Sequence, residues 1–312
     1  MTFEEWELTV QVERPVDFAS LLHHGCDIME YYESQDFGHY FSMLNGPTYE
    51  NLVKYLWVRA TVYDKHAAKM KEAEKVLIDP SLEGKTREEM GLEPFVDTEI
   101  RSSIMGVPVF INQEIIAYMI GRASEGNYKD GLDNNNKSPW NDVVNETMFN
   151  SKKKGSYNNL SMEKKMMLKI LNENLLPKGG GSDQPLLEHK VFLQFFLKKE
   201  KANVPKYIFK HMIKTLKESQ LINKAWIPYG RLISEIFNQG GLLRGLSETR
   251  GFTDDMLGTV TSKIINGGTL ENMRLIKPEA IIKLETDLKE SRISLNLMEG
   301  FPLICQQDPL DV

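Results

Sequence analysis

Apolar residues recur every three or four positions along most of this chain, which is the spacing of helices with one buried face. Helix-start residues support the pattern, since Asn112 is a good N-cap and Pro139, Pro205, Pro228 and Pro278 suit first turns. The pattern predicts helices over residues 17–32, 48–74, 112–121, 138–148, 162–176, 184–199, 205–219, 228–238 and 279–290. The expected fold class is mainly α: a helical bundle, open to division into two helical subdomains, with a minor short β element.

Two segments favour extended chain instead of helix. Apolar residues occupy every second position of residues 6–12, which predicts either an edge strand or a tail outside the fold. Residues 104–111 form a compact apolar run in which Val107 precedes Pro108, a pair that disfavours helix.

An asparagine-rich stretch marks the expected domain boundary. Residues 126–138 contain Asn134-Asn135-Asn136 and almost no apolar anchor, which predicts a mobile loop. We expect an N-terminal extension over residues 1–36, a helical subdomain over 37–125 and a C-terminal helical domain over 139–312.

Composition narrows the class of protein. The chain has 312 residues, 41% of them hydrophobic, enough for one large core or two modest ones. Its two cysteines, Cys26 and Cys305, lie nearly the whole chain apart, and no apolar run or basic leader suggests membrane insertion or secretion. We therefore expect an intracellular protein, cytoplasmic or nuclear, without a membrane partner.

Charge is distributed unevenly along the chain. The net charge is 38 minus 44, or −6, but residues 151–226 hold 16 lysines, no arginine and 6 acids. The lysines that we identify as candidate nucleic-acid contacts are Lys152, Lys153, Lys154, Lys198, Lys199, Lys206, Lys210, Lys214 and Lys217. The alternative is that these lysines form the solvated faces of amphipathic helices, whose buried faces carry residues such as Phe192, Phe196 and Tyr207.

The residues that could carry chemistry do not form a complete motif. His23, His24 and Cys26 supply too few ligands for zinc and lack an orienting acid for catalysis. The glycines after Lys178 lack the order of a phosphate-binding P-loop, and Asp254-Asp255 with Asp142 does not identify a nuclease. We expect no enzyme activity, no cofactor, no metal and no small-molecule substrate.

Several phrases in the chain resemble a known family. They include Met43-Leu44-Asn45-Gly46-Pro47, Leu56-Trp57-Val58-Arg59-Ala60, Ile104-Met105-Gly106-Val107-Pro108-Val109 and Ile227-Pro228-Tyr229-Gly230-Arg231. Together, over residues 37–312, they resemble the plant transposon protein domain family, which includes Gag-like and envelope-like reading frames of long-terminal-repeat retrotransposons. The end at Val312, just after a family-like phrase, suggests a fragment or an interrupted frame.

The resemblance implies a non-enzymatic, retrotransposon-derived protein that acts in Gag-like assembly or in handling of the element RNA. A second hypothesis is a nucleic-acid-binding module that uses residues 151–226. A metal-dependent transposase or nuclease is the third, and it has the least support. The expected partners are accordingly a second copy of the chain and RNA or DNA.

Overall fold

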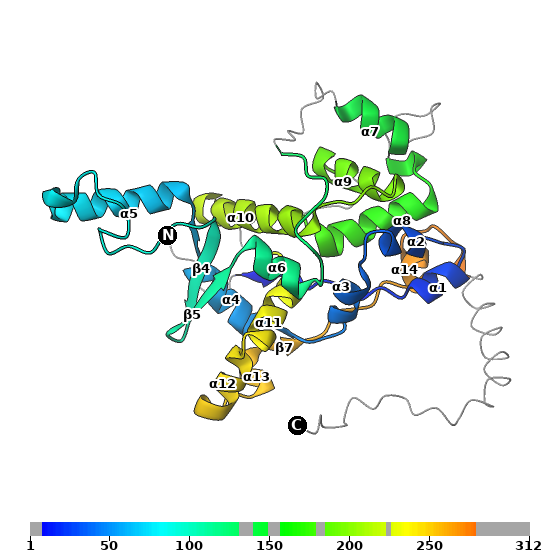
Figure 1. Cartoon of the computed structure of the whole chain (residues 1–312). Helices are drawn as coiled ribbons and strands as arrows, with labels where there is room; N and C mark the ends of the chain where they lie inside the picture. The colour runs from blue at the N-terminus through cyan, green and yellow to red at the C-terminus, as the bar shows by residue number, and fades with distance from the viewer. Residues whose placement is uncertain (1–7, 131–139, 149–156, 179–184, 223–225, 279–312) are drawn as a thin grey trace.

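The computed structural model describes residues 8–130, 140–148, 157–178, 185–222 and 226–278, and the chain is mainly helical (Figure 1). Up to residue 130 the elements are β1 (Thr9–Val10), α1 (Phe18–His23), α2 (Met29–Glu33), α3 (Gly38–Met43), β2 (Thr48–Tyr49), α4 (Glu50–Arg59), β3 (Thr61–Tyr63), α5 (Lys65–Ile78), η2 (Pro80–Leu82), β4 (Glu99–Ile104), β5 (Val107–Ile111) and α6 (Gln113–Met119). From residue 140 they are α7 (Trp140–Met148), η3 (Tyr157–Asn159), α8 (Met162–Ile170), η4 (Leu171–Leu175), α9 (Leu187–Leu197), α10 (Val204–Ile222), β6 (Trp226–Ile227), α11 (Gly230–Gln239), α12 (Leu242–Arg250), α13 (Asp254–Leu257), β7 (Thr259–Val260) and α14 (Gly267–Asn272).

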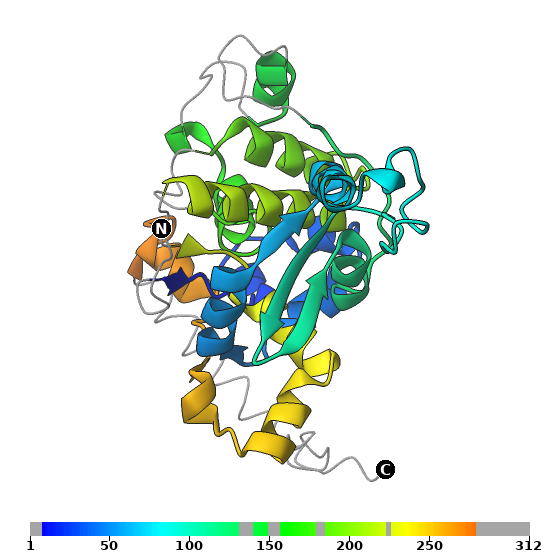
Figure 2. The ribbon, with the colours of Figure 1, turned by 90° about the vertical axis from the view of Figure 1, so that its left-hand side faces the viewer.

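Short strands connect distant parts of the chain. β1 pairs in parallel with β6, and β2 pairs in antiparallel fashion with β7. The third sheet has the order β3-β4-β5, all antiparallel, and Figure 2 shows it between α4 and α6. The expected edge strand near the N-terminus is confirmed for Thr9–Val10, which pair with β6, and Leu8 and Val10 are buried.

The prediction of one helix over residues 48–74 was wrong. The segment instead forms β2, α4, β3 and the start of α5. Thr61, Val62 and Tyr63 favour strand, and they pair with β4, whose existence the sequence pattern did not predict. The carboxylate of Asp64 then accepts hydrogen bonds from the N–H groups of His66 and Ala67 and starts α5.

Two other predicted elements divide at turns. The expected helix over residues 17–32 is split into α1 and α2, because Gly25 adopts a φ of 81°, in the left-handed region. The extended run 104–111 is confirmed in part: Val107–Ile111 is β5, whereas Ile104 ends β4 and Met105-Gly106 form the two-residue turn of the hairpin. The β content is thus larger than one minor element.

Helix starts and ends were predicted with mixed success. Asn112 caps α6 as expected, since its side chain accepts from Ile115 N at 2.8 Å. The helix expected from Pro228 begins only at Gly230, because Tyr229 has a φ of 62°. The helix expected over 162–176 ends in a π-helical turn, η4, and the one expected over 279–290 lies outside the described residues.

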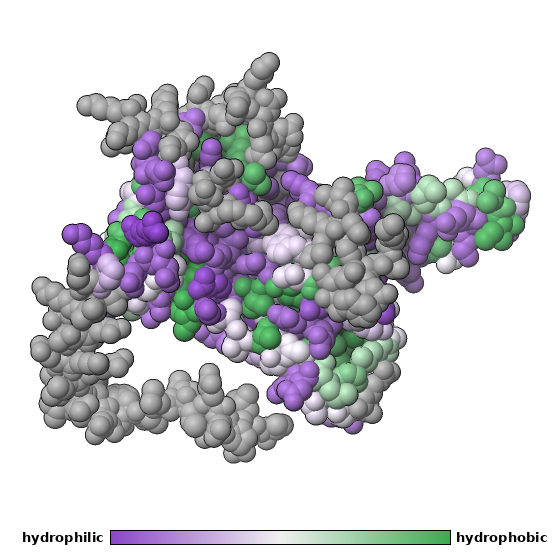
Figure 3. All heavy atoms as spheres, turned by 180° about the vertical axis from the view of Figure 1, so that it is seen from behind, coloured by the Kyte–Doolittle hydropathy of each residue, from purple (hydrophilic) through white to green (hydrophobic). Residues whose placement is uncertain are grey.

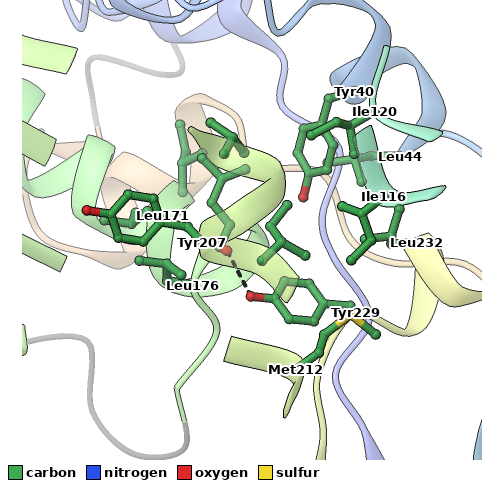
Figure 4. Close-up of a cluster of buried hydrophobic side chains, with 14 of the residues drawn as sticks. Tyr40, Leu44, Ile116, Ile120, Leu171, Leu176, Tyr207, Met212, Tyr229 and Leu232 are labelled. Atoms are coloured by element: carbon green, nitrogen blue, oxygen red, sulfur yellow. Dashed lines mark hydrogen bonds between the residues drawn. The ribbon is translucent and has the colours of Figure 1, made fainter. Parts of the chain in front are cut away.

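One contiguous core connects the described segments. Figure 4 shows Tyr40 and Ile116, from the first half of the chain, beside Tyr229 and Leu232 from the second half. The hydroxyl of Tyr229 donates to Leu175 O at 2.9 Å, which holds α11 against η4. Buried side chains of this cluster extend from Leu8 to Leu270. The domain boundary at 126–138 stays a prediction, and residues 131–138 of it lie outside the described part.

Candidate functional site

We call the nine candidate lysines the lysine stripe; four of them lie on α10, and Lys198 and Lys199 directly follow the end of α9. Phe192, Phe196, Tyr207 and Met212 are buried on α9 and α10, whereas Lys210 is exposed. The lysines at 198, 199, 214 and 217 are exposed as well, and Lys152, Lys153 and Lys154 lie outside the described residues. Helix α10 therefore has one buried and one solvated face, as expected, whereas α9 has no exposed residue and is enclosed on all sides.

Acidic residues from the first half of the chain neutralise part of this stripe. Lys199 pairs with Glu30, and Lys217 pairs with Asp64 at 3.0 Å. Because Glu30 and Asp64 are more than 150 positions away in the sequence, their effect could not be predicted from the local excess of lysine.

Two further lysines of the stripe also have partners within the molecule. The Nζ of Lys206 lies 4.7 Å from the ring centroid of Tyr128. Burial raises the pKa of the Glu188 carboxyl, and the nearby charge of Lys214 opposes that shift. In the described part of the chain, this leaves Lys198 and Lys210 as the members of the stripe without such a partner. The stripe therefore presents less free positive charge to a phosphate backbone than its lysine count suggests.

The histidine-cysteine cluster is not built for catalysis or metal binding. Cys26 is fully buried, and burial raises the pKa of its thiol to about 12, so the thiolate form is suppressed at neutral pH. The Nδ1 of His24 lies 2.6 Å from Ser20 O, within the same turn. Among the described residues, no group of three or more His, Cys, Asp or Glu is arranged to hold a metal ion.

We predict that Cys26 resists modification in the folded protein. With Cys305 replaced by serine, a colorimetric disulfide reagent at pH 7 should react with Cys26 at least about 100-fold more slowly in the native protein than in urea, because the thiol is buried and protonated. Comparable native and unfolded rates would show that the thiol is accessible.

The remaining candidate groups also lack a catalytic arrangement. Asp254 and Asp255 lie in the exposed first turn of α13, and Asp142 lies in α7. His189 is buried, its Nε2 lies 2.8 Å from Leu176 O, and burial lowers its pKa to about 4.

A buried ionic network, which the sequence analysis missed, holds the N-terminal segment against α11. The carboxylate of Glu13 accepts from the backbone N–H groups of Arg231 at 2.7 Å and Leu232 at 3.1 Å. The guanidinium of Arg231 donates to Met43 O at 2.9 Å and pairs with Glu235.

Close packing around this network explains one glycine. A Cβ at Gly46 would collide with the Arg231 guanidinium, so a larger residue there would have to displace that group from its buried bonds. Burial raises the pKa of Glu13 to about 7, although the two N–H groups and the Arg231 charge lower it. The network lies in the core and serves the fold.

An apolar groove of about 330 Å³ opens along the free edge of β5. We call it the edge groove, and its walls come from β5, α6, α11 and α12 (Figure 1). Its lining residues are Val107, Pro108, Val109, Phe110, Ile115, Tyr118, Met119, Ile236, Phe237, Gln239, Gly240 and Leu242. Tyr118 is 72% exposed, and Val107 and Phe110 are nearly half exposed. A hollow of this size lies within the range of ligand pockets, and its lining favours an apolar occupant.

A second apolar surface projects from the molecule. Helix α5 extends outward as an arm (Figure 1), and only Ala68 among its side chains is buried. At the end of the arm, Leu77 is 84% exposed and Ile78 is 82% exposed; we call this pair the arm tip. Hydrophobic side chains are visible at the end of the arm in Figure 3.

The base of the arm is braced, but its tip is not. Arg87 donates to Ala68 O at 2.9 Å, to Tyr63 Oη at 2.8 Å and to Glu72 at 2.7 Å, and Glu72 lies six residues before the end of α5. Because a helix of 14 residues has marginal stability without packing, the last turn of α5 gains little support from the rest of the molecule.

A smaller polar pocket of about 260 Å³ lies at Arg122. The guanidinium lies 5.0 Å from the Phe37 ring centroid and donates to Ala202 O at 3.2 Å, and burial lowers its pKa. Asp36, which pairs with Lys201, also lines the pocket, and so does Glu125. An anion bound there would meet two carboxylates, so the pocket is poorly suited to phosphate.

No family model, no curated protein and no solved structure matches this chain. The resemblance to plant transposon proteins therefore stays a prediction. Among the residues that the structure describes, no helix is both long enough and apolar enough to cross a membrane. The features that bear on function are therefore the surfaces described above: the edge groove, the arm tip and the lysine stripe.

Proposed function

We propose that this chain is a non-enzymatic assembly protein that associates with copies of itself, in the manner of a Gag-like protein derived from a retrotransposon. The observation that carries the proposal is the pair of exposed apolar surfaces, the edge groove and the arm tip, on one chain. Apolar patches of this kind on a water-soluble surface mark sites of protein association.

The proposal includes the finer architecture expected from the sequence. The helices up to residue 125 and those from residue 139 would form two helical subdomains of one assembling unit inside the cell. The edge groove is lined by residues from both parts, since Val107 and Tyr118 precede the division and Phe237 and Leu242 follow it.

Handling of nucleic acid by the lysine stripe is the second candidate. The exposed lysines Lys198 and Lys210 support it, whereas the pairing of Lys199 and Lys217 with acids weakens it. The stripe also lacks arginine. Because arginine is the residue best suited to bidentate recognition of guanine, its absence favours contact with phosphates over reading of bases. A metal-dependent nuclease gains no support from the described acidic residues.

Light scattering of the full chain over a concentration series, with and without single-stranded RNA, tests the proposal. We expect the mean mass to rise above the 35.8 kDa of one chain as concentration rises, without RNA and with little change between 0.1 and 0.5 M salt. A monomer at every concentration would refute self-association. Growth only with RNA, lost at high salt, would favour the lysine stripe.

A further inference from the structure

We propose that the arm tip of one copy inserts into the edge groove of the next copy, so that the chain associates head to tail. This inference rests on the proposed function and assigns its two contact surfaces. The arm tip is convex and carries Leu77 and Ile78, whereas the edge groove is concave and lined by apolar side chains. Because the two surfaces differ, each copy can insert its arm tip into one neighbour and bind the arm tip of another in its own groove.

The arm cannot fill the groove of its own chain. Figure 1 shows α5 pointing away from α12 and from the edge groove, and Arg87 fixes the base of the arm to Tyr63 and Glu72. The helix spans about 21 Å at 1.5 Å per residue and therefore carries its tip well clear of the molecule. An arm tip can therefore reach an edge groove only from a second copy of the chain.

The free edge of β5 favours a helix end over an added strand. The two-residue turn makes Ile104 and Val107 a hydrogen-bonded pair, so the next pair, Ser103 and Pro108, points its backbone groups away from the partner strand. Pro108 has no N–H to offer at that free edge. An incoming strand would lose a backbone hydrogen bond there, whereas apolar side chains from a helix end need only the hollow.

Charges beside the two surfaces are complementary. The arm ends at the C-terminus of α5 with the carboxylate of Asp79, whose pKa is lowered by the hydroxyl and the N–H of Ser81. The edge groove contains the start of α12, where Gly241 provides no side-chain cap for the free N–H groups. The negative end of one helix would thus face the positive end of another.

A second pair of opposite charges favours the same docking of the arm tip in the edge groove. Lys75 is exposed one turn before the end of α5. Glu114 is exposed one turn before Tyr118 on α6, and residues four apart share a helix face. A lysine beside the tip and a glutamate beside the groove favour the same docking.

Two charged double variants of the full chain test the contact. Leu77→Asp with Ile78→Asp blocks the arm tip, and Phe110→Asp with Tyr118→Asp blocks the edge groove; both replace exposed side chains and should fold, as circular dichroism would check. Each should raise the concentration of half-maximal association at least about 30-fold, the effect of losing one interface hot spot. Val96→Asp is the matched control, because Val96 is 90% exposed but lies in neither surface, and it should associate as the unaltered chain does.

Mixing the two variants gives the decisive measurement. The arm-blocked chain keeps its groove and the groove-blocked chain keeps its arm, so an equimolar mixture should form a complex of twice 35.8 kDa and stop there. Failure of the mixture to associate, or association by either variant alone at the level of the unaltered chain, would overturn the inference and leave self-association itself standing. A monomeric unaltered chain would overturn both.

Discussion

Replacing Arg231 by methionine should lower the free energy of unfolding by about 3 to 5 kcal/mol, the range for removal of one partner from a buried ion pair. The guanidinium is buried and donates to Met43 O and to Glu235. Methionine fills part of its volume but leaves the Glu235 carboxylate without its cation and the Met43 carbonyl without its donor. Urea denaturation followed by circular dichroism would measure the change.

Arg244→Met provides the matched control for this variant. Arg244 is exposed on α12, so the same substitution there should change the free energy of unfolding by no more than about 0.5 kcal/mol. If Arg231→Met costs less than about 1 kcal/mol, the buried ion pair within α11 and the bond to Met43 O contribute little to stability. Combining Arg231→Met with Glu235→Met should recover part of the loss, because the buried Glu235 carboxylate is then removed together with its cation.

Glu13 should make the protein less stable as pH rises from about 4.5 to 7. Its pKa is raised from 4.5 to about 7 by burial, so between these values the native state keeps a proton that the unfolded chain releases. The native state therefore binds more protons, and the free energy of unfolding falls with increasing pH. A shift of this size corresponds to about 3 kcal/mol in total.

The measurement is the difference in unfolding free energy between the unaltered chain and Glu13→Gln at pH values from 4 to 8. His189, whose lowered pKa acts in the opposite direction between 6.5 and about 4, is present in both proteins, so its contribution cancels. The difference should fall with rising pH and level off above 7. Glu33→Gln, at an exposed position, should leave the pH dependence unchanged. A difference independent of pH would mean that Glu13 titrates alike in both states.

The proposed head-to-tail contact would also explain why the end of α5 is apolar. A protruding helix with one buried side chain gains little stability from its own molecule. Docking in a groove would supply the burial that the arm lacks, at about 25 cal/mol for each Å² of apolar surface removed from water. The arm would then be expected to become more protected from amide exchange when the chain associates.

Local patterns in the sequence determined the helices α6 to α11, whereas α3, α12, α13 and α14 were not predicted. The apolar spacing of α9 and α10 places Phe192, Phe196 and Tyr207 in the core, and the cap at Asn112 starts α6 as expected. These features depend on neighbours within one or two turns, so periodicity and capping residues are enough to predict them. The mainly α class of the fold follows from the same short-range information.

Long-range contacts decided the rest. The run Glu99–Ile104 has no clear strand pattern, and it becomes β4 because β3 and β5 lie on either side of it. Likewise, the sequence around Glu13 suggests a surface residue. Glu13 is buried instead, because it accepts a hydrogen bond from the backbone N–H of Arg231, 218 positions later. Spacing along the chain carries no information about partners so far apart, and only packing shows them.

For the candidate interaction surfaces, too, part of the information lies in the sequence and part only in the tertiary structure. The lysine stripe was visible in the sequence, but its partial neutralisation by Glu30 and Asp64 depends on tertiary contacts. The edge groove could not be predicted, because Val107 and Leu242 line it from distant elements, and its one signal in the sequence was the apolar run around Pro108. The signal of the arm tip was the apolar pair before Asp79-Pro80. Whether an apolar residue is buried or left exposed depends on what the fold brings against it, so the tertiary structure alone placed the groove and the arm.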